Sequence, residues 1–126
     1  MVSINILTIP VEKMRYPTCG DYWYDQYGTL QIRVADIGDE FYEKMIIIHE
    51  LIEEAITKKN GITEQQIMDF DLRFEADRKK GNLDEPGFDK NCIYRKEHTF
   101  ATSVEIGMCA MANVDFVEYD TKVNEL

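Results

Sequence analysis

Residues 39–61 read DEFYEKMIIIHELIEEAITKKNG, and this stretch decides how the rest of the chain is interpreted. It predicts a helix over 39–59, because Asp39 can cap the first turn and the Asn60–Gly61 pair is a typical stop signal. Four consecutive apolar residues occupy positions 45–48. Since successive residues of a helix are turned by about 100°, these four side chains cover nearly its whole circumference. We therefore expect this helix to be buried on most sides.

The residues before this helix predict strands over about 3–36. Alternating isoleucines near the start of the chain end at Pro10. The segments YWYD and TLQIRVAD have the pattern of an antiparallel hairpin, because a turn at 26–28 with a glycine separates them. In the second segment apolar and polar residues alternate, as in a strand with one buried face.

The residues after this helix predict two further long helices, over 63–80 and 93–112. A loop over 81–91 separates them, and the tail after Val114 has the pattern of one more short amphipathic helix. Strands that are followed by a run of helices are typical of the α+β class. We therefore expect a single α+β domain over residues 1–126.

The charge of the chain excludes several classes of protein. It has 126 residues, with 24 acidic against 14 basic side chains and a net charge of -10. Because such a surface repels phosphate groups, we expect no direct binding to nucleic acid or to a membrane.

The start of the chain lacks the features of a secretory leader, and three cysteines without a CxxC pair fit a reducing compartment. These features predict a cytoplasmic protein and leave its oligomeric state open.

The sequence HELIE carries the candidate chemistry. Helical spacing places His49 and Glu53 on one face, one turn apart, where both can bind a single metal ion. Glu50 is turned by about 100° from His49, so it can reach a water molecule held by the metal without binding the metal itself. A third ligand is needed, and His98 is the only other histidine. We predict that His49, Glu53 and His98 bind zinc or another divalent ion, with Glu50 as the general base.

Three further residues of the helix predicted over 93–112 are candidates for supporting this site. Glu105 lies seven residues after His98, on the same face of the helix. Either Glu105 or Glu97 can hold a ligand in place or act as an alternative ligand. Tyr94 lies one turn before His98 and is a candidate for stabilising a developing oxyanion.

A second interpretation needs no metal. In it, Glu50, Glu53 and Glu54 line a solvated stripe of the helix, and His49 is a core histidine with satisfied hydrogen bonds. A histidine and two carboxylates among Met, Ile, Leu and Ala are costly to bury unless they are paired or coordinated, which favours the metal. Another group of acidic side chains, on the helix predicted over 63–80, is expected to be solvated: Asp69, Asp71, Glu75 and Asp77.

The strand TLQIRVAD, a turn and the helix EKMIIIHELIEEAI resemble the core of zincin-type metallopeptidases. HELIE with a later EHxFA is also similar to small bacteriophage proteins, which would place the chain in the cytoplasm of a host cell. The resemblance covers residues 28–58 and, more loosely, the third predicted helix. It implies that His49 binds the metal, that Glu50 is the general base, and that the strand before the helix is an edge that pairs with extended peptide. Glu53 stands where the family motif HExxH has its second histidine.

These residues predict a zincin-like, metal-dependent hydrolase with a peptide or protein substrate. Two other functions stay open. The net charge of -10 also fits a non-catalytic acidic interaction protein, such as a DNA mimic or an inhibitor of a host enzyme. Glu50 and Glu53 also match the first half of the ExxE and ExxD pair with which helical nucleotide pyrophosphohydrolases hold magnesium. The second half is missing, because position 78, three after Glu75, is an arginine.

Overall fold

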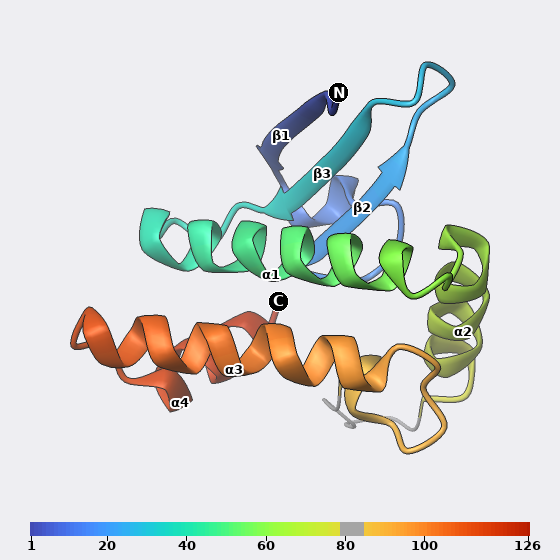
Figure 1. Ribbon diagram of the computed structural model, residues 1–126. Coiled ribbons are helices and arrows are strands. Elements are labelled where there is room, and N and C mark those ends of the chain that lie inside the picture. Colours follow the sequence, from blue (N-terminus) through green and yellow to red (C-terminus); the bar gives the residue numbers. More distant parts are fainter. Residues whose placement is uncertain (79–84) are drawn as a thin grey trace.

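A three-stranded sheet opens the computed structural model, which describes residues 1–78 and 85–126 (Figure 1). The strands are β1 (Ile4–Ile9), β2 (Gly20–Tyr24) and β3 (Leu30–Ala35), in the order β1-β3-β2. β2 and β3 form the predicted antiparallel hairpin, whereas β1 joins β3 in parallel. Helices follow the sheet, so the predicted α+β class is confirmed.

The central strand β3 is the most buried of the three. Its residues Leu30, Ile32 and Val34 are at most 2% exposed. The resemblance to zincins implies that the strand directly before the HELIE helix is an edge, and this expectation is wrong. That strand is β3, and its backbone is hydrogen-bonded on both sides, to β1 and to β2, while its apolar side chains pack against the helices. The edge strand that contacts the HELIE helix is β2.

The HELIE helix, α1 (Glu40–Lys59), lies between the sheet and helix α3 (Arg95–Met111), as Figure 1 shows. Asp39 caps its first turn by accepting a hydrogen bond from the Tyr42 backbone N–H. In the run of apolar residues, Met45 and Ile46 are buried and the next two isoleucines are half-buried. A helix with a layer on each side needs apolar residues around most of its circumference, which explains the unbroken run.

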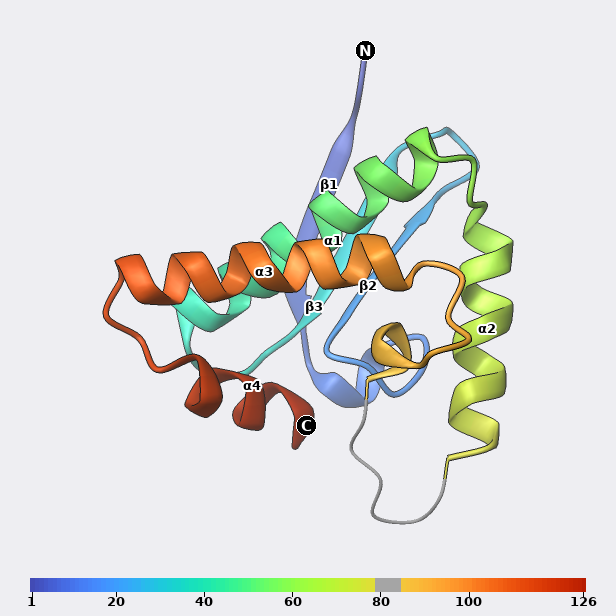
Figure 2. The ribbon, with the colours of Figure 1, turned by 60° about the horizontal axis from the view of Figure 1, so that its bottom comes forward.

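Helix α2 (Glu64–Ala76) lies across the end where α1 finishes and α3 begins (Figure 2). It ends at Ala76, before the predicted end at residue 80. The Asp77 N–H closes the last turn on the Arg73 carbonyl, and the charged residues that follow offer no apolar side chain to hold another turn. Positions 79 and 80 lie outside the described residues.

In the part of the segment between α2 and α3 that the structure describes, Pro86–Phe88 form the 3₁₀ turn η2. The first part of the loop predicted over 81–91 lies outside the described residues. Helix α3 begins and ends within the predicted range and runs antiparallel to α1 (Figures 1 and 2). The tail forms the predicted short amphipathic helix, α4 (Phe116–Asn124), which contacts α3.

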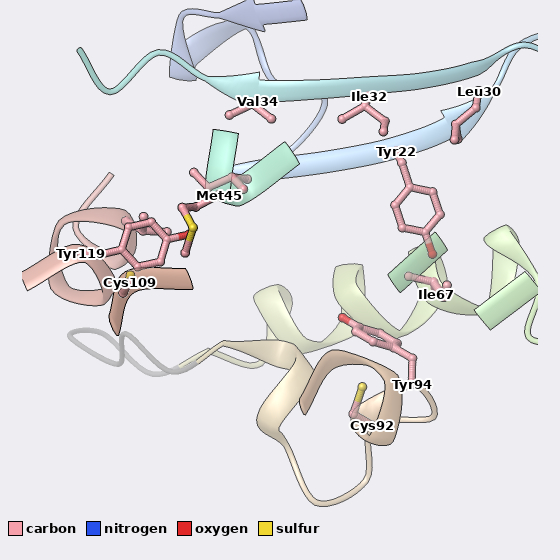
Figure 3. Close-up of a cluster of buried hydrophobic side chains, with 12 residues drawn as sticks. Tyr22, Leu30, Ile32, Val34, Met45, Ile67, Cys92, Tyr94, Cys109 and Tyr119 are labelled. Atoms are coloured by element: carbon pink, nitrogen blue, oxygen red, sulfur yellow. The ribbon is translucent and has the colours of Figure 1, made fainter. Parts of the chain in front are cut away.

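The apolar core joins the sheet to the helices. Figure 3 shows the side chains of Leu30, Ile32 and Val34 pointing from β3 toward the helices. Met45 of α1 and Tyr119 of α4 belong to the same cluster and are almost fully buried. None of the described helices combines the length and the apolar character that crossing a bilayer requires.

Candidate metal centre

Two histidines and a carboxylate meet where α1 and α3 run antiparallel. His49 Nε2 lies 3.0 Å from Glu53 Oε2 and 3.1 Å from His98 Nδ1. Glu53 Oε2 lies 2.9 Å from His98 Nδ1, so the three atoms form a nearly equilateral triangle. All three residues are at most 8% exposed, which rules out a solvated stripe at Glu53. The structure thus brings together the three residues predicted as ligands.

The other nitrogen of each histidine faces a further carboxylate. His49 Nδ1 donates to Glu105, and His98 Nε2 donates to Glu85 Oε2 over 2.8 Å. An ionised carboxylate can only accept a hydrogen bond, so in a neutral ring the proton sits on this outer nitrogen. The inner nitrogens, His49 Nε2 and His98 Nδ1, then present lone pairs to the centre of the triangle.

Lone pairs that face one another across about 3 Å repel unless a proton or a metal cation lies among them. Ligand histidines in metal sites almost always donate their outer N–H to a carboxylate, a carbonyl or water, which fixes the tautomer and raises ligand basicity. Glu105 and Glu85 hold His49 and His98 in this way. The donor set therefore fits a divalent ion at the centre of the triangle.

The size of the triangle also fits a zinc ion. Zinc binds histidine nitrogen and carboxylate oxygen at about 2.0–2.2 Å in tetrahedral geometry, which separates the ligand atoms by roughly 3.4 Å. The distances among His49, Glu53 and His98 are a few tenths of an ångström shorter. A small outward shift of the side chains would admit the ion.

The ionisation of the three residues shows that the centre attracts positive charge. Burial alone would lower the pKa of His49, but contacts with Glu105 and Glu53 outweigh it and raise the pKa well above its usual value. Burial likewise opposes the contacts of His98 with Glu53 and Glu85, which raise its pKa to about 9. Burial would raise the pKa of Glu53, yet the two histidines lower it to about 2.

Glu50 lies beside the triangle and faces the start of β2. A Cβ atom at Gly20 would lie 2.6 Å from Glu50 Oε1 and 2.7 Å from Ile46 Cγ2, so a larger residue there would displace the carboxylate and Ile46. Among the described residues, no group donates a hydrogen bond to the Glu50 carboxylate. Burial first, and then the charge of Glu53, raise its pKa well above its usual value. A half-buried carboxylate with a raised pKa and no partner is suited to accept a proton.

A cavity of about 330 Å³ lies in front of this centre, within the described part of the chain. His49, Glu50, Glu53 and His98 all line it, together with residues from 15–22 at the β2 edge, from α2, from the η2 segment and from α4. The candidate ligands therefore have one side open to the cavity, as a catalytic ion requires and a closed structural ion does not.

The remaining candidates from α3 occupy different positions. Glu105 bridges His49 and Tyr119, since the Tyr119 hydroxyl donates to its second oxygen, so it lies on the outer side of the His49 ring and not in the triangle. Glu97 is directed away from the centre and accepts a hydrogen bond from Asn60, 3.0 Å away. Its other oxygen, Oε2, is buried without a partner among the described residues.

Tyr94 lines the cavity, but its hydroxyl donates to Asp71. Asp71 also accepts a hydrogen bond from the Tyr16 hydroxyl, 3.2 Å away, and is only 6% exposed. The expectation that Asp71 is solvated is therefore wrong. It lies four residues after the buried Ile67, on the same side of α2, so the helix turns it inward.

Three residues of the site were not identified from the sequence: Glu85, Gly87 and Tyr119. Gly87 has a local signal, because the Pro86–Gly87 pair marks a tight turn, and a Cβ atom there would collide with the His98 ring. Glu85 and Tyr119 have none, since they reach the centre only through the packing of the η2 segment and α4 against α3.

The comparisons with known proteins give no relative. No protein-family model matches the chain, and neither a curated protein nor a solved structure matches it significantly.

Proposed function

We propose that this chain is a zincin-like, metal-dependent hydrolase whose zinc ion is held by His49, Glu53 and His98. One observation carries the proposal: the inner nitrogens of both histidines and a Glu53 oxygen converge within about 3.1 Å, while carboxylates hold the outer nitrogens. Two histidines and one glutamate, with a side open to a cavity, are a ligand set of catalytic zinc sites.

The departure from HExxH is compensated by the third ligand. In the zincin pattern two histidines lie on one helix and a glutamate can come from another, whereas here Glu53 shares α1 with His49 and the second histidine, His98, comes from α3. Both sets contain two histidines and one carboxylate, so the net charge of the ion with its three ligands is the same. A zinc ion so bound lowers the pKa of water to about 7 and polarises a carbonyl group.

Glu50 is the general base of this proposal. It follows His49 directly, it lines the cavity, and its raised pKa suits a group that takes a proton from water and passes it to a leaving group. The edge strand β2 borders the same cavity, and an extended peptide could pair with it in place of Thr18 and Glu64, which bond to the backbone of Gly20 and Tyr24. A peptide or protein is the substrate class that this arrangement favours.

The test compares three proteins for zinc content and for cleavage of a mixture of unstructured peptides, followed by mass spectrometry. Glu50→Gln is expected to abolish cleavage while one zinc ion per chain stays bound. Glu54→Gln, a neighbouring carboxylate that bonds to Tyr24 instead, is expected to keep both properties. Loss of zinc in Glu50→Gln, or unchanged cleavage, would contradict the role of Glu50.

The net charge of -10 supports a second candidate, a non-catalytic acidic protein that occupies a basic surface of a partner enzyme. This role needs neither the ion nor Glu50. It predicts that a His49→Ala protein still captures its partner, whereas the hydrolase loses its activity on the same change.

A further inference from the structure

The walls of the cavity carry far more negative than positive charge. Of the described residues that line it, eight are Asp or Glu, two are Arg and none is Lys. Both arginines are already paired with carboxylates of the same walls. Arg15 contacts Asp21 at 2.7 Å and Arg78 contacts Glu75 at 2.8 Å. Even with a divalent cation in place, the cavity keeps a negative potential, which disfavours phosphates and carboxylates as ligands.

Apart from Glu50, which lies beside the candidate ligands, Asp71 is the carboxylate on these walls that most needs a counter-charge. It is 6% exposed, and within the described part of the chain no Lys, Arg or His forms an ion pair with it. Its two oxygens accept one hydrogen bond each, from Tyr94 and from Tyr16. Since each carboxylate oxygen can accept two, Asp71 can still receive the N–H groups of a ligand.

Burying a carboxylate without a cation is costly, and the pKa of Asp71 reflects this cost. Burial first, and then the charge of Glu53, raise its pKa to about 7. A cation next to Asp71 would remove the penalty. The rings of Tyr16 and Tyr94 also line the cavity beside it, and aromatic rings attract ammonium and guanidinium groups.

We propose that the cavity selects substrates with a cationic side chain, such as lysine or arginine, and that Asp71 is the residue that recognises this charge. The inference rests on the proposed function, because the ion held by His49, Glu53 and His98 would anchor the reacting group at the other part of the same cavity. A lysine side chain is long, flexible and apolar up to its ammonium group, which suits an apolar wall that ends in a carboxylate.

The experiment uses Nα-acetyl amino-acid hydroxamates, which bind zinc through the hydroxamate and place their side chain in the cavity. Binding to the zinc-loaded protein is measured by calorimetry at pH 8, where Asp71 is ionised. We expect the lysine compound to bind at least tenfold more tightly than its uncharged analogue from norleucine, and the glutamate compound to bind most weakly. In Asp71→Asn this preference for lysine should fall to about twofold or less, with the norleucine affinity and the zinc content unchanged.

Asp69→Asn is the matched control, since Asp69 lies on the same helix, is exposed and bonds to Gln65 outside the cavity. It removes the same charge and should keep the preference for lysine. Equal binding of the lysine and norleucine compounds, or a preference that survives Asp71→Asn, overturns the inference while the zinc ion and the role of Glu50 stand. A protein that binds no zinc overturns both the inference and the proposed function.

Discussion

His49 Nδ1 donates a hydrogen bond to Glu105, a carboxylate 56 residues further along the chain. Glu105 in turn accepts a hydrogen bond from Tyr119, so one carboxylate links α1, α3 and α4. The contact fixes the orientation of the His49 ring and leaves its Nε2 directed at Glu53 and His98. The candidate metal centre therefore depends on the packing of α3 and α4 around the HELIE motif of α1.

The first prediction concerns Glu105→Gln, which keeps the shape of the side chain and removes its charge. The amide oxygen can still accept from His49, but it no longer raises the basicity of the ring. We expect the dissociation constant for zinc to rise about 10- to 100-fold. Competition with a chelating dye measures this constant.

Glu97→Gln is the control for this prediction, because Glu97 lies on the same helix and is equally buried but bonds to Asn60. Its zinc affinity should stay within a factor of about three of the wild type. Equal losses in both variants would show that Glu105 acts only through the general stability of α3.

The second prediction concerns Gly87→Ala. A methyl group at this position would collide with the His98 ring, so either the ring or the η2 segment must move. We expect weaker zinc binding and loss of the contact between His98 and Glu85. Gly107→Ala is the control, since nothing lies within 4 Å of the added atom, and alanine favours a helix by about 1 kcal/mol over glycine. An unchanged zinc affinity in Gly87→Ala would contradict the close packing on His98.

The third prediction concerns pH and Asp71 in the metal-free protein. Its folded pKa of about 7 lies above the usual value, so the folded state holds the proton more tightly than the unfolded chain. The protonation of Asp71 therefore stabilises the folded state. This stabilisation is complete below about pH 4 and is lost as pH rises through 7. Groups that face Asp71 are Tyr16, Tyr94, Glu53 and His98.

Asp71→Asn removes this titration, so the variant should gain stability relative to the wild type as pH rises. From pH 5 to pH 8, the free energy of unfolding of the variant should increase by roughly 2–3 kcal/mol relative to that of the wild type. Urea denaturation at both pH values measures it. A constant difference would mean that Asp71 titrates at an ordinary pKa in the folded protein.

The fourth prediction concerns zinc and thermal stability. An ion that binds only the folded state stabilises it by about 2.7 kcal/mol at a free concentration 100 times its dissociation constant. For a chain of this length that corresponds to a rise in Tm of roughly 10 °C. A chelator should reverse the rise, and His98→Ala should show none. A Tm that zinc does not change would argue for a purely ionic His–Glu cluster.

Much of the fold was predictable because its signals are local. Asp39 caps α1 and the Asn60–Gly61 pair ends it, both within one turn of the helix they mark. The hairpin of β2 and β3 follows from alternation and a turn of a few residues. The parallel pairing of β1 with β3 depends on residues 26 positions apart and had no such signal.

The convergence of the three candidate ligands was predictable for a different reason, namely that the sequence offers few choices. The chain has two histidines, and helical spacing ties His49 to Glu53, so His98 was the natural third ligand. Glu85 and Tyr119 belong to abundant residue types, and only the packing of their segments selects them. The acidic composition of α2 predicts a solvated Asp71, but its position four residues after the buried Ile67 places it on the inner side of the helix.

The most direct test of the metal centre is a crystal structure of the protein grown with equimolar zinc, with anomalous data collected at the zinc absorption edge. One strong peak is expected at about 2.0–2.2 Å from His49 Nε2, Glu53 Oε2 and His98 Nδ1, with the fourth position directed into the cavity. A zinc-replete crystal with no peak among these three atoms would contradict the assignment. A zinc ion bound by Glu105 and not by His98 would contradict it as well.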